Sequence, residues 1–165
     1  MKFNFKEVFK LRNILTFIAF MIVYFLPSIL FPVDKNYYNS LKGFKIPSIV
    51  FIIVWTIIYI ALSIFITYHI YRNKEKDNCE SYKRLIAFLV LNYIFMFLYT
   101  VVFFKFHNLF LGYIMCLFTF LTILLAMMES ALINKKSALL LLPYVLWSLF
   151  ASILSIMFYL QNEKH

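Results

Sequence analysis

Trp147 and the small side chains around it are the residues of this sequence best suited to bind a ligand. They lie in the apolar stretch ALLLLPYVLWSLFASILSIMFYLQN, residues 138–162. At about 100° per residue in a helix, one arc collects the small and hydroxylated residues, with Trp147 at its edge: Tyr144, Ser148, Ala151, Ser152, Ser155 and Tyr159. The opposite arc is apolar and is expected to face lipid: Val145, Leu146, Leu149, Phe150, Ile153, Ile156, Met157 and Leu160.

The chemistry that an indole offers beside small residues is the binding of a flat apolar molecule. Such a pair leaves a flat-walled notch with one N–H donor. Two purely structural roles fit the same residues. Small side chains such as Ser148 let a neighbouring helix approach closely, and Trp is common where a helix crosses the surface of the bilayer.

Asn92 is the second chemical signal, because it lies well inside an apolar run. An amide in that position is costly unless it is hydrogen-bonded, so Asn92 is predicted either to join two helices or to contact a ligand. Phe95 is on the same side of that segment, and Phe51 and Trp55 share a face of another. Aromatic stripes of this kind form a helix core more often than a pocket.

Signals for enzymatic chemistry are weak. The two cysteines, Cys79 and Cys116, form no CxxC motif or Cys/His cluster, so we expect no metal site, no cofactor and no disulfide framework. The sequence also offers no evident pair of carboxylates or of nucleophile and base. A binding protein is therefore expected rather than an enzyme.

The composition identifies the solvent in which these residues must be held. Of 165 residues, 64% are hydrophobic and 14% are charged, whereas about a quarter of the residues of a soluble domain are charged. Only two glycines occur and the apolar segments do not alternate with period two, which disfavours a membrane barrel. The fold class is therefore predicted to be an all-α integral membrane protein.

Five apolar segments are long enough to cross a bilayer, which takes about 20 residues. They run approximately over residues 13–31, 47–71, 85–104, 108–133 and 137–160, within a single membrane domain of residues 1–165. Short connections make the last three helices antiparallel neighbours. The first connection, residues 32–46, is the longest and contains several aromatic side chains, so we predict that it is a lid rather than a plain tether.

Orientation follows from the distribution of Lys and Arg. Eleven of the 16 lie at the N-terminus and in the second and fourth connections. The positive-inside rule then places the N-terminus in the cytoplasm and the C-terminus outside a plasma membrane. This rule also accounts for the net charge of +9, so no nucleic-acid partner is expected. Glu129 and His69 lie near the ends of their segments and are predicted to reach water there.

Three motifs resemble those of the TspO/MBR family, the tryptophan-rich sensory proteins of bacteria and the translocator proteins (peripheral benzodiazepine receptors) of mitochondria. Residues 138–155, ALLLLPYVLWSLFASILS, are similar to the family's LLxPYxxWxxFAxxL pattern in helix five. Residues 54–59, VWTIIY, resemble VWTxLY in helix two, and residues 91–93, LNY, match helix three. The resemblance covers nearly the whole chain.

The resemblance implies a bundle of five transmembrane helices, commonly dimeric, with a ligand pocket beneath the first connection. Family members bind porphyrins and other flat apolar ligands, and animal members bind cholesterol. Matching the family by position, the resemblance implies these ligand-binding residues: Trp147, Ala151, Asn92, Phe51 and Trp55, with Tyr38 and Phe44 from the covering loop. Ser148 and Phe95 are added to the predicted site from the helix faces described above.

The chain departs from the family before helix two, where the family has KPxWxPPxW. Here residues 41–51 are LKGFKIPSIVF, with Phe44 at the first Trp, Ile46 at the first Pro of the pair and Ile49 at the second Trp. Met115 occupies a position that is acidic in the family.

The leading functional hypothesis is a membrane receptor or sensor for a tetrapyrrole, such as porphyrin or haem, or for a similar flat or sterol-like molecule, acting with lipid around it and as a homodimer. Two alternatives stay open. One is light-dependent breakdown of porphyrin, with Trp147 as the redox partner. The other is a transporter of small hydrophobic molecules or a membrane scaffold, although transporters usually carry ionisable groups inside the membrane.

Overall fold

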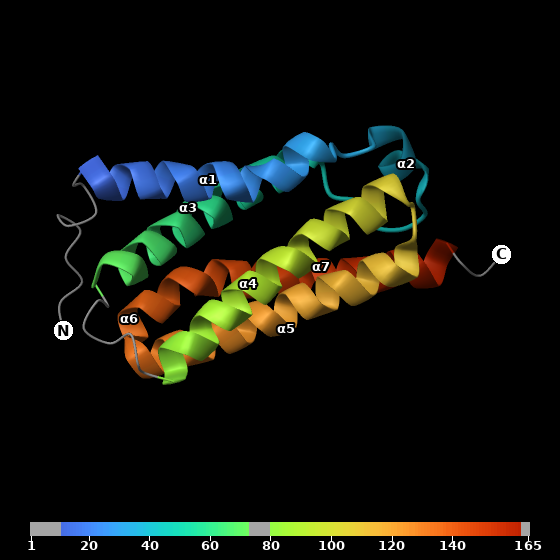
Figure 1. Cartoon of the computed structure of the whole chain (residues 1–165). Coiled ribbons are helices and arrows are strands. Elements are labelled where there is room, and N and C mark those ends of the chain that lie inside the picture. Colours follow the sequence, from blue (N-terminus) through green and yellow to red (C-terminus); the bar gives the residue numbers. More distant parts are fainter. Residues whose placement is uncertain (1–10, 73–79, 163–165) are drawn as a thin grey trace.

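The structure, a computed structural model, describes residues 11–72 and 80–162, and these form helices joined by short connections (Figure 1). The N-terminal lysines and residues 73–79 of the second connection, including Cys79, lie outside the described residues. The helices are α1 (Leu11–Leu30), α2 (Lys35–Ser40), α3 (Ser48–Arg72), α4 (Glu80–Thr100), the π-helix η2 (Val101–Lys105), α5 (Leu109–Ile133), α6 (Lys135–Ala138), the 3-10 turn η3 (Leu139–Leu141) and α7 (Leu142–Asn162).

Five of these stretches have the length and composition of membrane-spanning helices. They are Leu11–Leu30, Ser48–Tyr71, Glu80–Lys105, Leu109–Ile133 and Lys135–Asn162, with mean hydropathies of 2.1 to 2.9. Large apolar side chains cover their outer surfaces, including Ile53, Val90 and Leu132, as expected where lipid is the solvent. The prediction of an all-α bundle of five transmembrane helices is confirmed.

Local signals in the sequence set where several helices begin. The side chain of Asn108 accepts a hydrogen bond from the backbone of Leu111 and caps the start of α5. Asn134 does the same for α6 by accepting from Lys136 N, at 3.0 Å. Pro143 lies in the first turn of α7, where its missing N–H is not needed. The last two transmembrane helices are therefore separated by a single capping residue.

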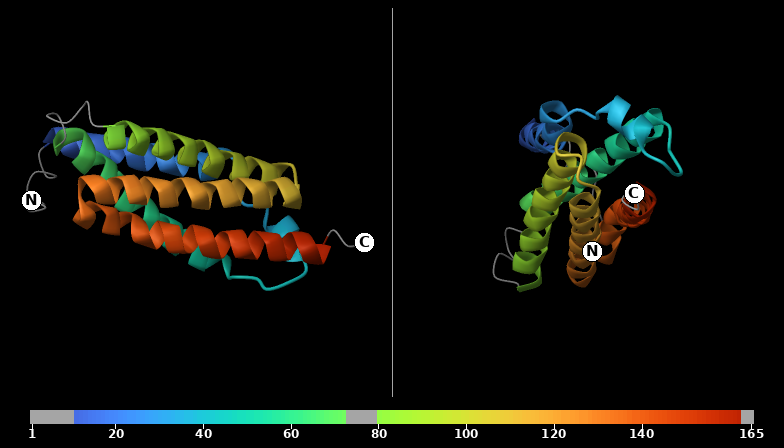
Figure 2. Two further views of the ribbon diagram at one scale, coloured as in Figure 1. Left: turned by 90° about the horizontal axis from the view of Figure 1, so that it is seen from below. Right: turned by 90° about the vertical axis from the view of Figure 1, so that its right-hand side faces the viewer.

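The bundle has two parts. α1 packs on α3, while α4 packs along α5 and α5 along α7 (Figure 1). Figure 2 shows α2 and the chain around it lying across the end of the bundle that holds the C-terminal end of α7. The start of α1, the end of α3, the start of α4 and α6 lie at the opposite end. Residues 32–46, called the lid segment below, thus cover one end of the bundle.

Some boundaries differ from those predicted. The third transmembrane helix begins at Glu80 rather than residue 85, because its polar first turn is helical and Arg84 bonds both Glu80 and Glu129. The fifth begins at Lys135 rather than residue 137. Val145, predicted to face lipid, is buried because it lies where α7 packs into the core.

Candidate functional site

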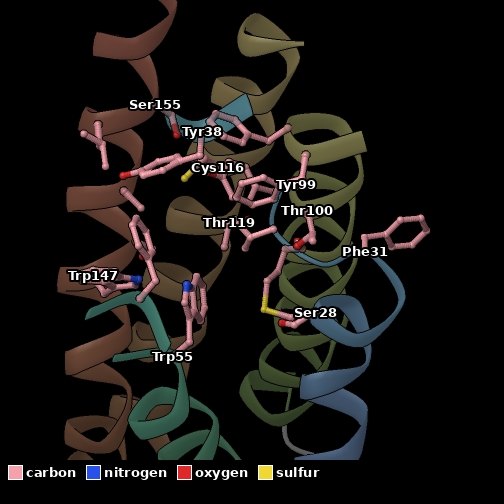
Figure 3. Close-up of a pocket in the computed structure, with 18 of the residues that line it drawn as sticks. Ser28, Phe31, Tyr38, Trp55, Tyr99, Thr100, Cys116, Thr119, Trp147 and Ser155 are labelled. Carbon is pink, nitrogen blue, oxygen red and sulfur yellow. The ribbon is translucent and has the colours of Figure 1, made fainter. Parts of the chain in front are cut away.

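A cavity of about 210 Å³ lies beneath the lid segment, with walls from all five transmembrane helices (Figure 3). Each helix contributes at the level where the lid segment crosses the bundle. The lining residues are Ser28, Phe31, Val33, Lys35, Tyr38, Ser48, Phe51, Ile52, Trp55, Tyr59, Met96, Tyr99, Thr100, Phe103, Phe104, Cys116, Thr119, Trp147, Ser148, Ala151, Leu154, Ser155 and Phe158. The lining is mostly apolar and aromatic, as is usual for small-molecule sites.

The lid segment is held in place by its own hydrogen bonds. The Tyr38 hydroxyl accepts from Ile46 N at 3.1 Å and donates to Ile46 O at 3.3 Å, which closes the loop on itself. Burial raises the pKa of this hydroxyl above its ordinary value near 10. The Tyr38 ring also packs edge-on against Phe51 and Phe158, at 6.0 and 5.8 Å between centroids. Tyr38 therefore lines the cavity and also holds the lid segment over it.

A second contact ties the lid segment to the connection between α4 and α5. Tyr37 stacks on His107, with centroids 3.9 Å apart and planes 15° from parallel, and its hydroxyl donates to His107 O at 3.2 Å. Asp34 caps α2 through Tyr37 N and lies 3.5 Å from His107 Nε2. His107 itself has a positive φ of 52°, a conformation that this contact holds in place.

The aromatic wall comes from α3 and α7. Phe51 packs edge-on against Trp147 with centroids 5.6 Å apart, and Trp55 lies 5.4 Å from Tyr59. The Trp147 Nε1 atom is buried and has no hydrogen-bond partner in the described part of the chain. Figure 3 shows this nitrogen turned toward Trp55 and the cavity. Because buried donors are nearly always paired in folded proteins, this N–H is available to a ligand or a water molecule.

Hydroxyl and thiol groups also line the cavity or lie next to it, but several of their hydrogen bonds are made within their own helices. Ser148 donates to Val145 O at 3.1 Å and Ser152 to Ser148 O at 2.8 Å. Thr119 donates to Met115 O at 2.8 Å. Cys116 is buried, and its Sγ lies 3.6 Å from Ser152 Oγ. These small groups therefore provide space more than unpaired polarity.

Six of the nine predicted site residues line the cavity: Trp147, Ala151, Trp55, Phe51, Tyr38 and Ser148. The other three do not. Asn92 donates through Nδ2 to Thr119 O at 2.8 Å and to Thr122 Oγ1 at 3.2 Å, so it joins α4 to α5.

Phe95 stacks on Phe118 of α5 at 5.0 Å, and Phe44 is 62% exposed on the lid segment. The surroundings of Phe95 and Phe44 explain why neither side chain lines the cavity. Phe95 lies on the side of α4 along which α5 packs, and the side chain of Phe44 lies on the exposed surface next to Gly43, whose φ is positive.

Several lining residues were not among the predicted site residues, including Met96, Tyr99, Cys116 and Thr119. A signal for the last two was present in the sequence. Small and polar residues recur along one side of the fourth transmembrane helix and are buried in the structure: Gly112, Cys116, Thr119, Thr122, Ala126 and Ser130. This small-residue stripe marks the face of α5 that its neighbours approach.

A second cavity, of about 380 Å³, lies between α1, α3 and α4 nearer the other end of the bundle. Three of the four polar side chains that line it are engaged: Tyr93 donates to Val23 O at 3.0 Å, Tyr82 to His69 O at 3.4 Å, and His69 Nε2 lies 3.2 Å from Ser137 Oγ. The prediction that His69 reaches water is wrong, because the side chain is buried beneath these contacts. We therefore take the cavity beneath the lid segment as the candidate site.

Comparisons with known proteins agree with this arrangement. The model of the TspO/MBR family matches residues 14–160. The chain is 35% identical over 150 residues to the tryptophan-rich protein TspO of Bacillus cereus, covering 88% of this chain and 94% of that protein. It is 34% identical over 130 residues to the uncharacterized membrane protein YtaB of Bacillus subtilis, covering 76% of this chain and 80% of that protein.

Proposed function

Because the chain belongs to the TspO/MBR family, we propose that it is a membrane sensor that binds a flat apolar molecule of the tetrapyrrole class beneath the lid segment. The observation that carries this proposal is the unpaired, buried N–H of Trp147 on an aromatic wall. A flat ligand can lie against Phe51 and Trp147, and Ala151 beside them leaves the space for it. Aromatic rings prefer offset or edge-on contacts of this kind.

The size of the cavity bears on how such a ligand enters. A volume of about 210 Å³ is smaller than the roughly 300–1,000 Å³ of most small-molecule sites. A tetrapyrrole therefore needs the lid segment to move outward as it binds. The contacts that hold the lid segment, through Tyr38, Tyr37 and His107, then set the rate of entry and release.

Titration of the purified protein with protoporphyrin in the dark, in nanodiscs, tests this proposal through the shift of the porphyrin absorption band. Trp147→Ala removes the indole, and Ala151→Phe fills the notch. Ile153→Ala is the control, since Ile153 is exposed on the outer side of the same helix and does not line the cavity. We expect roughly tenfold weaker binding for the first two variants, as for loss of a buried aromatic contact, and no change for the control. Equal affinity in all four proteins would rule out this site.

Light-dependent breakdown of the bound porphyrin is the second candidate, because two indoles, Trp55 and Trp147, line the same cavity. The same samples test it when illuminated in air. Loss of porphyrin absorbance that depends on the protein and is abolished in Trp147→Phe would favour breakdown. Loss at the same rate with and without protein would exclude it.

We also propose that the chain lies in the plasma membrane with the lid segment outside. The support is the charge distribution. The start of α1, the start of α4 and α6 lie at the end of the bundle opposite the lid segment (Figure 1), and they carry Arg12, Lys83, Arg84, Lys135 and Lys136. This is the cytoplasmic end by the positive-inside rule. In a Cys79→Ser background, a membrane-impermeant maleimide applied to intact cells should label Asn39→Cys but not Lys136→Cys. The opposite pattern would reverse the orientation.

A further inference from the structure

The cavity beneath the lid segment carries one charged group at its edge. Among the described residues that line it, Lys35 is the one with a formal charge, and no Asp or Glu joins it. The remaining polar groups are hydroxyls, one thiol and the indoles. A purely apolar ligand offers no partner to a positive charge at the edge of the site. The ammonium group would then stay hydrated and contribute nothing to binding.

The acid nearest to Lys35 in sequence is already engaged. Asp34 accepts the capping hydrogen bond of Tyr37 N at 3.0 Å through Oδ1 and lies 3.5 Å from His107 Nε2 through Oδ2. None of the ion pairs in the described part of the chain includes Lys35, whose side chain is exposed. Its ammonium group is therefore free to meet an anion that a ligand brings.

A second cation lies beside another residue of the lining. Lys105 Nζ is 5.3 Å from the centroid of the Phe31 ring, in a cation–π contact, and Phe31 lines the cavity as Lys35 does. Figure 3 shows Phe31 across the cavity from Trp147. The side of the site that carries the Trp147 indole thus differs from the opposite side, where Lys105 lies over Phe31. Lys35 adds a second positive charge to the lining.

We propose that Lys35, supported by Lys105, forms a carboxylate subsite at the mouth of the cavity, so that the chain selects acidic flat amphiphiles over their neutral esters. This inference rests on the proposed function and names the ligand class more narrowly. The apolar body of the ligand lies against Trp147 and Phe51, and its carboxylate lies beside Lys35. Charge-assisted contacts of this type are stronger where water is partly excluded.

The test compares protoporphyrin with its dimethyl ester, which has the same ring and no carboxylate. Both are titrated in zwitterionic nanodiscs against the unmodified protein, Lys35→Gln, Lys35→Arg, Lys105→Gln and Lys42→Gln. Lys42 is the matched control, since it is an exposed lysine of the lid segment that does not line the cavity. Comparing each variant with the unmodified protein removes the difference in how the two porphyrins partition into lipid.

We expect Lys35→Gln to weaken binding of the diacid roughly three- to tenfold and to leave binding of the ester unchanged. Lys35→Arg should keep most of the affinity for the diacid, Lys105→Gln should lose a smaller part, and Lys42→Gln none. The advantage of the diacid should also shrink as salt is added. If Lys35→Gln affects the diacid and the ester equally, or neither of them, the carboxylate subsite is overturned while the pocket stands. If neither porphyrin binds the unmodified protein, the proposed function fails as well.

Discussion

Asn162, in the last turn of α7, holds the backbone of Lys42 from both sides. Its Oδ1 accepts from Lys42 N at 2.8 Å, and its Nδ2 donates to Lys42 O at 3.1 Å. The same Nδ2 also donates to Phe158 O at 2.8 Å within α7. One side chain at the end of the fifth transmembrane helix thus fixes the far part of the lid segment, 120 residues away in the sequence.

Replacing Asn162 should loosen the lid segment without altering the cavity wall, because Asn162 does not line the cavity. We expect Asn162→Ala to release protoporphyrin roughly three- to tenfold faster, since the net effect of each lost hydrogen bond is modest. Stopped-flow displacement of the bound porphyrin measures this rate. Asn36→Ala, an exposed change on α2, serves as the control. An unchanged dissociation rate in Asn162→Ala would show that this contact does not limit release.

Gly43 is the point where the lid segment turns toward α7, and its backbone requires a glycine. Its φ is +118°, a value that side chains other than glycine rarely adopt. A Cβ atom there would also collide with Gln161 Oε1 of α7. Gly43→Ala should therefore displace this part of the lid segment, at a cost of about 1–3 kcal/mol.

Limited proteolysis of the lid segment in nanodiscs would detect that displacement as faster cleavage. Adding Gln161→Ala to Gly43→Ala should restore part of the protection, because it removes the collision and leaves the backbone strain. Full restoration by Gln161→Ala would mean that the strain is negligible. No change in cleavage for Gly43→Ala would mean that the lid segment tolerates the side chain.

The transmembrane architecture could be predicted because the bilayer fixes the length of each span and lipid fixes the polarity of its surface. Predicted boundaries differ from the structure where polar residues continue a helix. The first turn of α4 is helical although Glu80 and Arg84 are charged, and an apolar run cannot indicate such a turn. The lid segment was expected as a loop with aromatic residues, and the capped helix α2 within it follows from Asp34.

The candidate site was predicted less completely, because helical periodicity gives the face of a residue but neither its depth nor the neighbour it meets. Asn92 and Tyr99 lie on one side of α4 two turns apart. Asn92 meets α5 through Thr119 O, whereas Tyr99 reaches the cavity. Lys35 could not be assigned to the site from sequence, since its position depends on how the lid segment folds back over the bundle.

Because Asn92 joins α4 to α5, its replacement is expected to lower the stability of the fold rather than the affinity for a ligand. Asn92→Ala removes the two hydrogen bonds from α4 to Thr119 O and Thr122 Oγ1. The cost should be about 1 kcal/mol. The cost stays this small because the Thr122 hydroxyl also donates to Phe118 O and to Thr119 O. Without Asn92, both Thr119 O and the Thr122 hydroxyl therefore keep a hydrogen-bond partner.

Thermal unfolding in detergent measures that loss, with Leu91→Ala, an exposed neighbour, as the control. The affinity of Asn92→Ala for protoporphyrin should stay within twofold of the unmodified protein, as expected for a residue outside the cavity wall. A loss of affinity without a loss of stability would instead assign Asn92 to the site.

Tyr38 predicts how the closed lid segment depends on pH. The neutral hydroxyl donates to Ile46 O, and burial holds its pKa above the ordinary value near 10. When closing of the lid segment raises the pKa of the phenol, the closed form binds the proton more tightly than the open form. The closed form therefore loses stability as the pH rises above about 10.

Dissociation of protoporphyrin dimethyl ester should therefore become faster above that pH. The ester is chosen because it has no carboxylate and therefore does not depend on the proposed contact with Lys35. In Tyr38→Phe the rate should already be raised at pH 7, because the bonds to Ile46 are gone, and its further increase above pH 10 should disappear. If the dissociation rate of Tyr38→Phe still increases above pH 10, another group causes the pH dependence and not Tyr38.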